Sequence, residues 1–459
     1  MSENTRLYFA PWERSLQRIA TPFEEFLHRQ TTTGVLLISC AVIALIIANS
    51  PLLGAYDKVL HMKVGLTVGS WSIKHSVHHW INDGLMAIFF FVIGLEIKRE
   101  IVAGELASIK NATLPVVAAV GGAVVPAFFY WLLNQGTEGI RGWGIPMATD
   151  IAFAVGVLAL LGRHAPKSLV TFLVALAIVD DLLAVSVIAL FYTDSIHVGY
   201  LITAVGITFL LIALNLFGIR RALPYFVLIV FLWIAMEGSG IHATIAGIIG
   251  AWTIPAYARY GPAEMGKRIR SIVDDYDRSY QPGTAIINNP KQSAHAWKIN
   301  HAMELGISPL QRLESTLHIP SAYLVIPLFA LANAGIPLDV EAISQAMTNP
   351  IALGIVLGLV LGKTIGIAGS VLLFRAIGIG ELPRGITPMH IIGVSMLAGI
   401  GFTMSIFISE LAFVWDGELI VIAKTGVLFA SLIAGIGGYL WLRWFGAQQA
   451  DQPEDSSAT

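Results

Sequence analysis

Four ionisable residues lie inside long apolar runs of the sequence, where charge is costly. Asp150 interrupts one run, the pair Asp180 and Asp181 stands midway along the next, and Lys363 stands midway along a later one. A charge near the centre of a bilayer costs about 2.5–3.5 kcal/mol or more, so such residues usually mark an ion pathway or a proton relay. Carboxylates and a nearby hydroxyl, that of Thr149, are oxygen ligands that suit a small hard cation. The same carboxylates can take protons instead, in competition with the cation.

The adjacent acids Asp180 and Asp181 are the most informative pair. Neighbouring positions on a helix are about 100° apart around its axis, so the two side chains point in different directions. One can face a water-filled cavity while the other faces a partner on another helix, and Lys363 is the obvious candidate for that partner. The interacting groups are expected to titrate as one coupled unit. The alternative is a buried structural ion pair without a transport role.

Composition indicates where these residues must lie. The chain has 459 residues, of which 56% are hydrophobic and only 13% are charged, against about 25% charged in ordinary soluble domains. A soluble fold of this length is excluded, and the net charge of −2 gives no basic surface for nucleic acid. The single cysteine, Cys40, excludes a disulfide framework. The sequence therefore predicts an all-α polytopic membrane protein.

Twelve apolar runs are long enough to be transmembrane helices. The predicted spans are Gly34–Asn49, Asp83–Ile97, Leu114–Leu133, Pro146–Leu161, Leu169–Tyr192, Tyr200–Phe217, Tyr225–Met236, Ile241–Ile254, Ser321–Ile336, Ile351–Leu373, His390–Phe413 and Leu419–Leu442. Around them we expect three parts: a cytoplasmic N-terminal segment (1–32), a twelve-helix domain (33–445) with a long cytoplasmic loop (258–317), and a disordered cytoplasmic tail (446–459). Most Lys and Arg residues fall on one side of this topology, which places both termini in the cytoplasm.

Two of the predicted helices are interrupted. In the fourth, Pro146 and Gly156 flank Thr149 and Asp150, and the eleventh contains three glycines followed by Phe-Thr-Met-Ser (402–405). Interrupted helices in corresponding halves of a transporter place a binding site between them. Because half-helix ends carry partial charges, Asp150 is expected to neutralise positive ends and Lys363 negative ones.

Other clusters have weaker signals. His75, His78 and His79 lie together, but no carboxylate follows closely, so metal binding is disfavoured. Residues 66–73 (LTVGSWSI) alternate as in a strand and predict a small extramembrane hairpin. Glu96, Arg99 and Glu100 close the second helix at the cytoplasmic surface, as an interfacial ion-pair cluster or as a pH-responsive gate.

Seven segments resemble the NhaA-type family of bacterial sodium/proton antiporters. They are WINDGLMAIFFFVIGLEIKRE (80–100), ATDIAFAVGVLALLG (148–162), VALAIVDD (174–181), GIHATIAG (240–247), IPLFALANAG (326–335), LGKTIGI (361–367) and GIGFTMSIFI (399–408). The resemblance implies twelve helices, an inverted repeat, and two discontinuous helices, the fourth and the eleventh, that cross near the midplane.

The resemblance also implies roles for individual residues. Asp180 and Asp181 are similar to an ion-binding pair, in which Asp181 is the primary ligand of Na+ and of the proton, with Thr149 as a further ligand. Asp150 and Lys363 resemble charge compensators, and Lys363 is also expected to pair with Asp180. The remaining candidates are Asp83 at the outer mouth and, for the cytoplasmic pH response, Glu96, Arg99, Glu100, Glu314, His318 and His242.

The function implied is electrogenic, pH-regulated extrusion of Na+ or Li+ in exchange for protons, with two protons per Na+. We expect a multi-pass homodimer in the lipid of the bacterial inner membrane, with a role in pH homeostasis, no cofactor, no enzymatic activity and no nucleic-acid partner. Two rival classes remain at this stage. A symporter of an organic anion would need more polar residues at depth, and an intramembrane aspartyl protease would need two aspartates that face each other from separate helices.

Overall fold

A computed structural model describes residues 30–68, 71–162, 165–193, 196–337, 343–344, 346, 348–380, 382 and 385–445. The predicted N-terminal segment, up to residue 29, and the predicted tail lie outside these residues. The chain divides into two compact units, which are described separately. Unit 1 comprises Met1–Leu60, Leu114–Asp180 and Ala322–Thr459, and unit 2 comprises His61–Thr113 and Asp181–Ser321.

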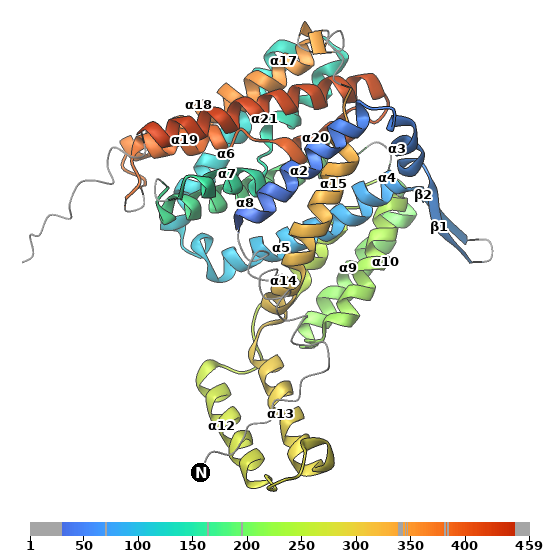
Figure 1. Cartoon of the computed structure of the whole chain (residues 1–459), viewed down its shortest axis with the longest axis vertical. Coiled ribbons are helices and arrows are strands. Elements are labelled where there is room, and N and C mark those ends of the chain that lie inside the picture. The colour runs from blue at the N-terminus through green and yellow to red at the C-terminus, as the bar shows by residue number, and fades with distance from the viewer. Residues whose placement is uncertain are drawn as a thin grey trace, which may run out of the picture. The chain divides into compact units, whose positions relative to one another are not determined.

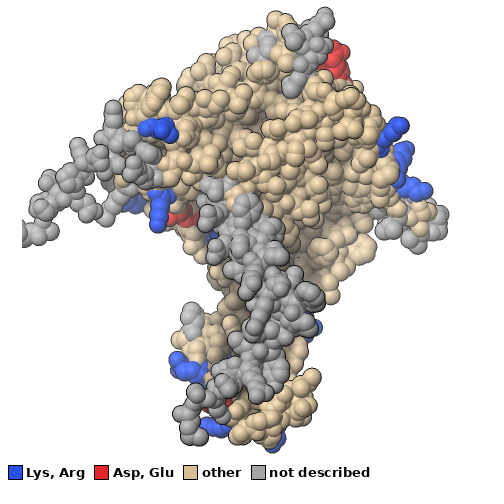
Figure 2. Space-filling view, in the orientation of Figure 1, with Lys and Arg blue, Asp and Glu red and all other residues tan. Residues whose placement is uncertain are grey.

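Apolar helices dominate the described chain. Seven helices are long and apolar enough to cross a membrane, and the number rises to ten if each bent pair is counted as one span. Large apolar side chains on these helices face outward, as on α9 (Val198–Leu216), where Phe209 is 68% exposed and Leu216 is 82% exposed. Figure 2 shows wide uncharged areas between small groups of charged residues. The chain is a multi-pass membrane protein, and the count of twelve spans and the inverted repeat stay predictions.

Unit 1 is built from helices that come from both ends of the sequence. Its elements are α2 (Gln30–Ala48), α3 (Leu53–Leu60), most of α6 (Ile109–Asn134), η3 (Glu138–Met147), α7 (Ile151–Leu160), the first part of α8 (Lys167–Phe191), α15 (Ile326–Asn333), α17 (Pro350–Leu357), η7 (Gly358–Gly362), α18 (Lys363–Ala376), α19 (Pro388–Leu397), α20 (Phe402–Ala412) and α21 (Gly417–Phe445). Helix α2 packs against α7 and α15, and the long α21 packs against α17 and α19 (Figure 1).

Glycines allow two of these helices to approach closely. A side chain added at Gly366 of α18 would collide with the carbonyl oxygen of Gly121 on α6, and one added at Gly121 would collide with the carbonyl oxygen of Gly366. Small residues at helix contacts of this kind are typical of membrane proteins, where packing replaces the hydrophobic effect between helices. The contact brings α6 against the helix that begins with Lys363.

Both predicted interruptions are present in unit 1. Elements η3 and α7 bend by 45° around residues 148–150, and helices α19 and α20 bend by 48° around residues 398–401. A third bend, of 115°, separates α2 from α3. Broken helices leave backbone N–H and C=O groups without partners in their own helix, so polar partners must come from elsewhere.

Unit 2 holds the remaining elements. They are β1 (Lys63–Val68), β2 (Trp71–Ser76), α4 (Val77–His79), the π-helix η1 (Trp80–Leu85), α5 (Met86–Ala103), η2 (Glu105–Ala107), the second part of α8, α9, α10 (Ala222–Ser239), α11 (Ile245–Thr253), α12 (Pro262–Arg278), η5 (Ile286–Asn288), α13 (Pro290–Gly306) and α14 (Pro309–Pro320). Helix α11 packs on α5, α10 lies beside α9, and α12 pairs with α13 (Figure 1).

The predicted hairpin is confirmed. Strands β1 and β2 pair in antiparallel register, with Lys63 opposite Ser76 and Leu66 opposite Ile73. The predicted loop 258–317 contains the helix pair α12 and α13. A helical stretch from Pro309 to Asn333, through α14, the π-helix η6 (Ser321–Val325) and α15, begins inside this predicted loop and continues into the ninth predicted span. Ser308 caps its start by accepting a hydrogen bond from the N–H of Gln311.

Candidate ion-binding site

Asp150 lies at the break between η3 and α7 and caps the starts of two helices. Its Oδ1 accepts a hydrogen bond from the N–H of Phe153, in the first turn of α7, at 3.0 Å. Its Oδ2 accepts bonds from the N–H and the hydroxyl of Thr403, in the first turn of α20, at 3.0 and 2.6 Å. The buried carboxylate therefore lies at the N-terminal ends of both half-helices, and its role as a charge compensator stays a prediction.

The two breaks lie directly against each other. The N–H of Asp150 donates to the carbonyl of Ile400 at 2.7 Å, and the Thr149 hydroxyl donates to the carbonyl of Ala398 at 2.8 Å. These bonds supply partners to backbone groups that the unwound segments leave without helical ones. Residues about 250 positions apart in the sequence thus form one polar centre inside an apolar unit.

Lys363 and Asp180 form a fully buried ion pair within unit 1. The Lys363 Nζ donates to the Asp180 Oδ2 at 2.7 Å, and the two side chains are 0% and 1% exposed. Thr149 also lies close to Asp180. The predicted partnership of Lys363 with Asp180 is therefore present. The compensation of negative helix ends by Lys363 stays a prediction.

Asp181 follows Asp180 on α8 and is also buried. The 100° step between adjacent helix positions turns its side chain away from the direction of Asp180. Of the predicted site residues in unit 1, Thr149, Asp150, Asp180 and Lys363 come from three separate helical regions and lie together. The described geometry therefore offers carboxylate and hydroxyl oxygens, the ligand type that a hard cation requires.

Thr403 is a site residue that sequence analysis missed, and its replacement tests the double cap. Thr403→Val keeps the shape but removes a hydrogen bond to a charged carboxylate, so we expect a stability loss of about 1.5–3 kcal/mol. The matched control is Thr364→Val, because the Thr364 hydroxyl bonds the Val360 carbonyl of its own turn. The midpoint of thermal unfolding of each variant in detergent is measured by circular dichroism and compared with that of wild type. Equal decreases of the midpoint in both variants would contradict the role of Thr403 as a partner of Asp150.

Five of the six candidates for the pH response cluster between α5 and α14 of unit 2. Arg99 bonds Glu314 at 2.7 Å and Glu100 at 2.8 Å. The His318 Nδ1 lies 3.4 Å from the Glu96 Oε1. This is a charged network at a helix–helix contact, and its role in a pH response stays a prediction.

His242, the sixth candidate, lies away from this network. It contacts Thr244 and lies within electrostatic range of Asp83 and His79. The Asp83 Oδ2 is 3.5 Å from the His79 Nε2. A hydrogen bond to Glu237 raises the pKa of His79 above its ordinary value, with the Asp83 charge acting in the same direction and burial opposing both.

A second ion pair lies between α20 and α21. The Lys424 Nζ is 2.5 Å from the Glu410 Oε1, and both side chains are largely buried. The sequence alone did not lead to this pair. The signal was available, since a glutamate near the end of one predicted span and a lysine within the next are each costly without a partner.

Comparison with known proteins shows the family to which the chain belongs. Residues 24–442 match the family described as Na+/H+ antiporter 1. A protein named Na(+)/H(+) antiporter NhaA from Sulfurimonas denitrificans is 51% identical over 436 residues, which cover 95% of this chain and 98% of that protein. One named Na(+)/H(+) antiporter NhaA 1 from Saccharophagus degradans is 48% identical over 458 residues, covering 98% and 99%. The chain belongs to the Na+/H+ antiporter 1 family.

Proposed function

We propose that the protein is an electrogenic, pH-regulated secondary transporter that extrudes Na+ or Li+ from the cytoplasm in exchange for protons. The observation that carries the proposal is the buried Asp180–Lys363 pair in the same unit as the two facing helix breaks, with Asp181 as the next residue in the chain. An aspartyl protease would need two aspartates that share a proton from separate helices, whereas Asp180 is neutralised by an ammonium group.

Asp181 is proposed as the group that carries either a proton or Na+. A carboxylate cannot hold both at once, so the binding of one ion excludes the other. Thr149 is a suitable further ligand, because its hydroxyl hydrogen is directed at the Ala398 carbonyl and its oxygen lone pairs remain for a cation. Asp180 adds a second carboxylate, whose charge Lys363 balances while no cation is bound.

We propose that a second group of the site, besides Asp181, also releases a proton when Na+ binds, so two protons exchange for one Na+ and one net positive charge moves inward in each cycle. An inside-negative membrane potential of 100 mV then contributes about 2.3 kcal/mol per cycle to Na+ extrusion. Since 1.4 kcal/mol corresponds to a tenfold ratio, this potential alone sustains a Na+ gradient of about 50-fold. An exchange of one proton for one Na+ would gain nothing from the potential.

The cellular setting is part of the proposal. The protein works by alternating access in the bacterial inner membrane, with both termini in the cytoplasm and a role in pH homeostasis. We propose a homodimer, with the β1–β2 hairpin as a contact between protomers. The network of Arg99, Glu314, Glu96 and His318 is proposed to set the pH response.

Proteoliposomes with an imposed membrane potential test both the antiport and its electrogenic stoichiometry. Valinomycin and potassium gradients set the potential, and a pH-sensitive dye and radioactive Na+ report the two fluxes. Exchange whose rate and extent follow the sign of the potential is the expected result. Exchange that is indifferent to the potential would contradict the electrogenic stoichiometry, and no Na+-dependent proton movement at all would contradict antiport itself.

A further inference from the structure

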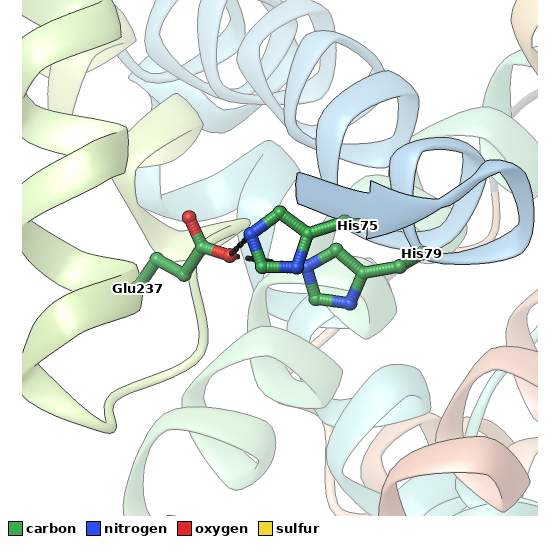
Figure 3. Close-up of side chains that lie close together, drawn as sticks. All are labelled: His75, His79 and Glu237. Atoms are coloured by element: carbon green, nitrogen blue, oxygen red, sulfur yellow. Dashed lines mark hydrogen bonds and ion pairs between the residues drawn. The ribbon is translucent and has the colours of Figure 1, made fainter. Parts of the chain in front are cut away.

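Two histidines and a glutamate converge in unit 2, far along the sequence from the acids of the ion-binding site. His75 is the last residue but one of strand β2 and His79 ends helix α4, while Glu237 lies near the end of α10. Figure 3 shows both imidazole rings facing the carboxylate of Glu237. The Nε2 atoms of both rings lie 3.1 Å from the same Glu237 Oε1. Glu237, about 160 residues away in the sequence, therefore supplies the carboxylate that the sequence around the histidines does not offer.

The geometry of these three atoms is that of metal ligands. All three lie within 4.8 Å of one another. Tetrahedral Zn2+ with bonds of 2.0–2.1 Å places its ligand atoms about 3.4 Å apart, close to both distances that end at Glu237. The two rings stack with their centroids 4.2 Å apart, and both Nε2 atoms lie beside the same carboxylate oxygen. Small shifts of the side chains bring all three atoms around one ion.

Neighbouring residues hold the ligands in place. The Ser76 hydroxyl accepts a hydrogen bond from the N–H of His79 at 3.1 Å, which fixes the start of α4 after β2. Trp80 donates to the Val64 carbonyl of β1, and its ring stacks on Trp233 of α10. The residues that carry both histidines are thus tied to the hairpin and to the helix that carries Glu237, as pre-organised metal sites require.

Charge and access also suit a divalent cation. Glu237 supplies one negative charge, and Asp83, whose Oδ2 is 3.5 Å from the His79 Nε2, supplies a second at the edge of the cluster. The three ligand side chains are between 20% and 33% exposed, so an ion from solution can reach them. Three protein ligands with access to water form an open site, in which water completes the coordination.

We propose that His75, His79 and Glu237 bind Zn2+, at a site separate from the one that binds the transported ion. Imidazole nitrogens favour Zn2+ and related transition metals, whereas Na+, Mg2+ and Ca2+ favour oxygen ligands. A bound ion joins the end of the hairpin to α10 and stabilises that part of unit 2.

Metal titration of the purified full-length chain tests the site. The protein, freed of any histidine tag and stripped with a chelator, is titrated with Zn2+ against a chromophoric chelator. We expect one Zn2+ per chain, insensitive to excess Mg2+, with affinity reduced at least about tenfold in His79→Gln and in Glu237→Gln. The matched control is His78→Gln, which removes the adjacent imidazole outside the cluster and is expected to leave the affinity unchanged.

Gel filtration and X-ray absorption distinguish the loss of a specific Zn2+ site from a general loss of folded structure. Each variant is first required to elute as wild type from gel filtration. X-ray absorption of the Zn2+-loaded wild type is expected to show nitrogen and oxygen ligands at about 2.0–2.1 Å with scattering from two imidazoles. Equal affinity in the three variants, or absorption without imidazole scattering, would overturn the proposal.

Discussion

Asp181→Asn is expected to abolish Na+-driven proton exchange while leaving the protein folded. The amide has the size of the carboxylate, so the packing around this buried side chain is preserved. It has no charge to offer Na+ and takes up no proton in the physiological range, so it loses both halves of the proposed exchange. The effect is therefore complete loss at every pH, and not a shift of the pH profile.

The measurement uses everted membrane vesicles whose interior is acidified by respiration. Dequenching of a pH dye on addition of Na+ is compared for wild type, Asp181→Asn and Asp274→Asn, the last removing an exposed acid from α12. We expect the α12 variant to match wild type and the Asp181 variant to match vesicles that lack the protein. Measurable exchange by a well-expressed Asp181→Asn protein would remove Asp181 from its proposed role.

Lys363→Ala is expected to cause the largest loss of stability. Removing the ammonium leaves the Asp180 carboxylate, only 1% exposed, without its countercharge at 2.7 Å. Breaking a buried pair from one side costs about 3–5 kcal/mol, because the remaining charge stays desolvated. The thermal midpoint in detergent is expected to fall well below that of wild type.

The double variant Lys363→Met with Asp180→Asn is the matched control. It removes both charges while keeping side chains of similar volume, and such replacements are often neutral for stability. We expect it to recover most of the midpoint that Lys363→Ala loses, although its transport should still be impaired. If the single and double variants unfold at the same temperature, the uncompensated charge is not the cause of the loss.

The deep charges were predictable from sequence because an ionisable residue within an apolar run is costly in any fold. This reasoning identified Asp150, Asp180, Asp181 and Lys363. The break at residues 148–150 was indicated by proline and glycine, whereas the glycines before residue 402 are equally typical of tight helix packing, so the break at 398–401 rested on the family resemblance as well. The pairing of Lys363 with Asp180 followed from depth and charge together with the family resemblance.

Partnerships between ordinary polar residues were not predictable in the same way. A threonine in a helix, such as Thr403, usually bonds its own turn, so nothing in its type indicated a bond to Asp150. Glu237 joins two histidines about 160 residues away, and only the packing of α10 reveals it. Glu314 and His318 favoured a polar loop before the ninth predicted span, and their polarity did not reveal the helix α14 that contains them.

The double cap made by Asp150 also constrains how the protein is synthesised. Its partner Thr403 lies 253 residues later in the chain. At about 5–20 residues per second, the ribosome needs tens of seconds to reach it. During that interval the unwound segment around Asp150 lacks the bonds that satisfy it in the finished protein. The polar groups of this segment must therefore find temporary partners in water or in the insertion machinery. The assembly of unit 1 is completed only after the C-terminal helices have been translated.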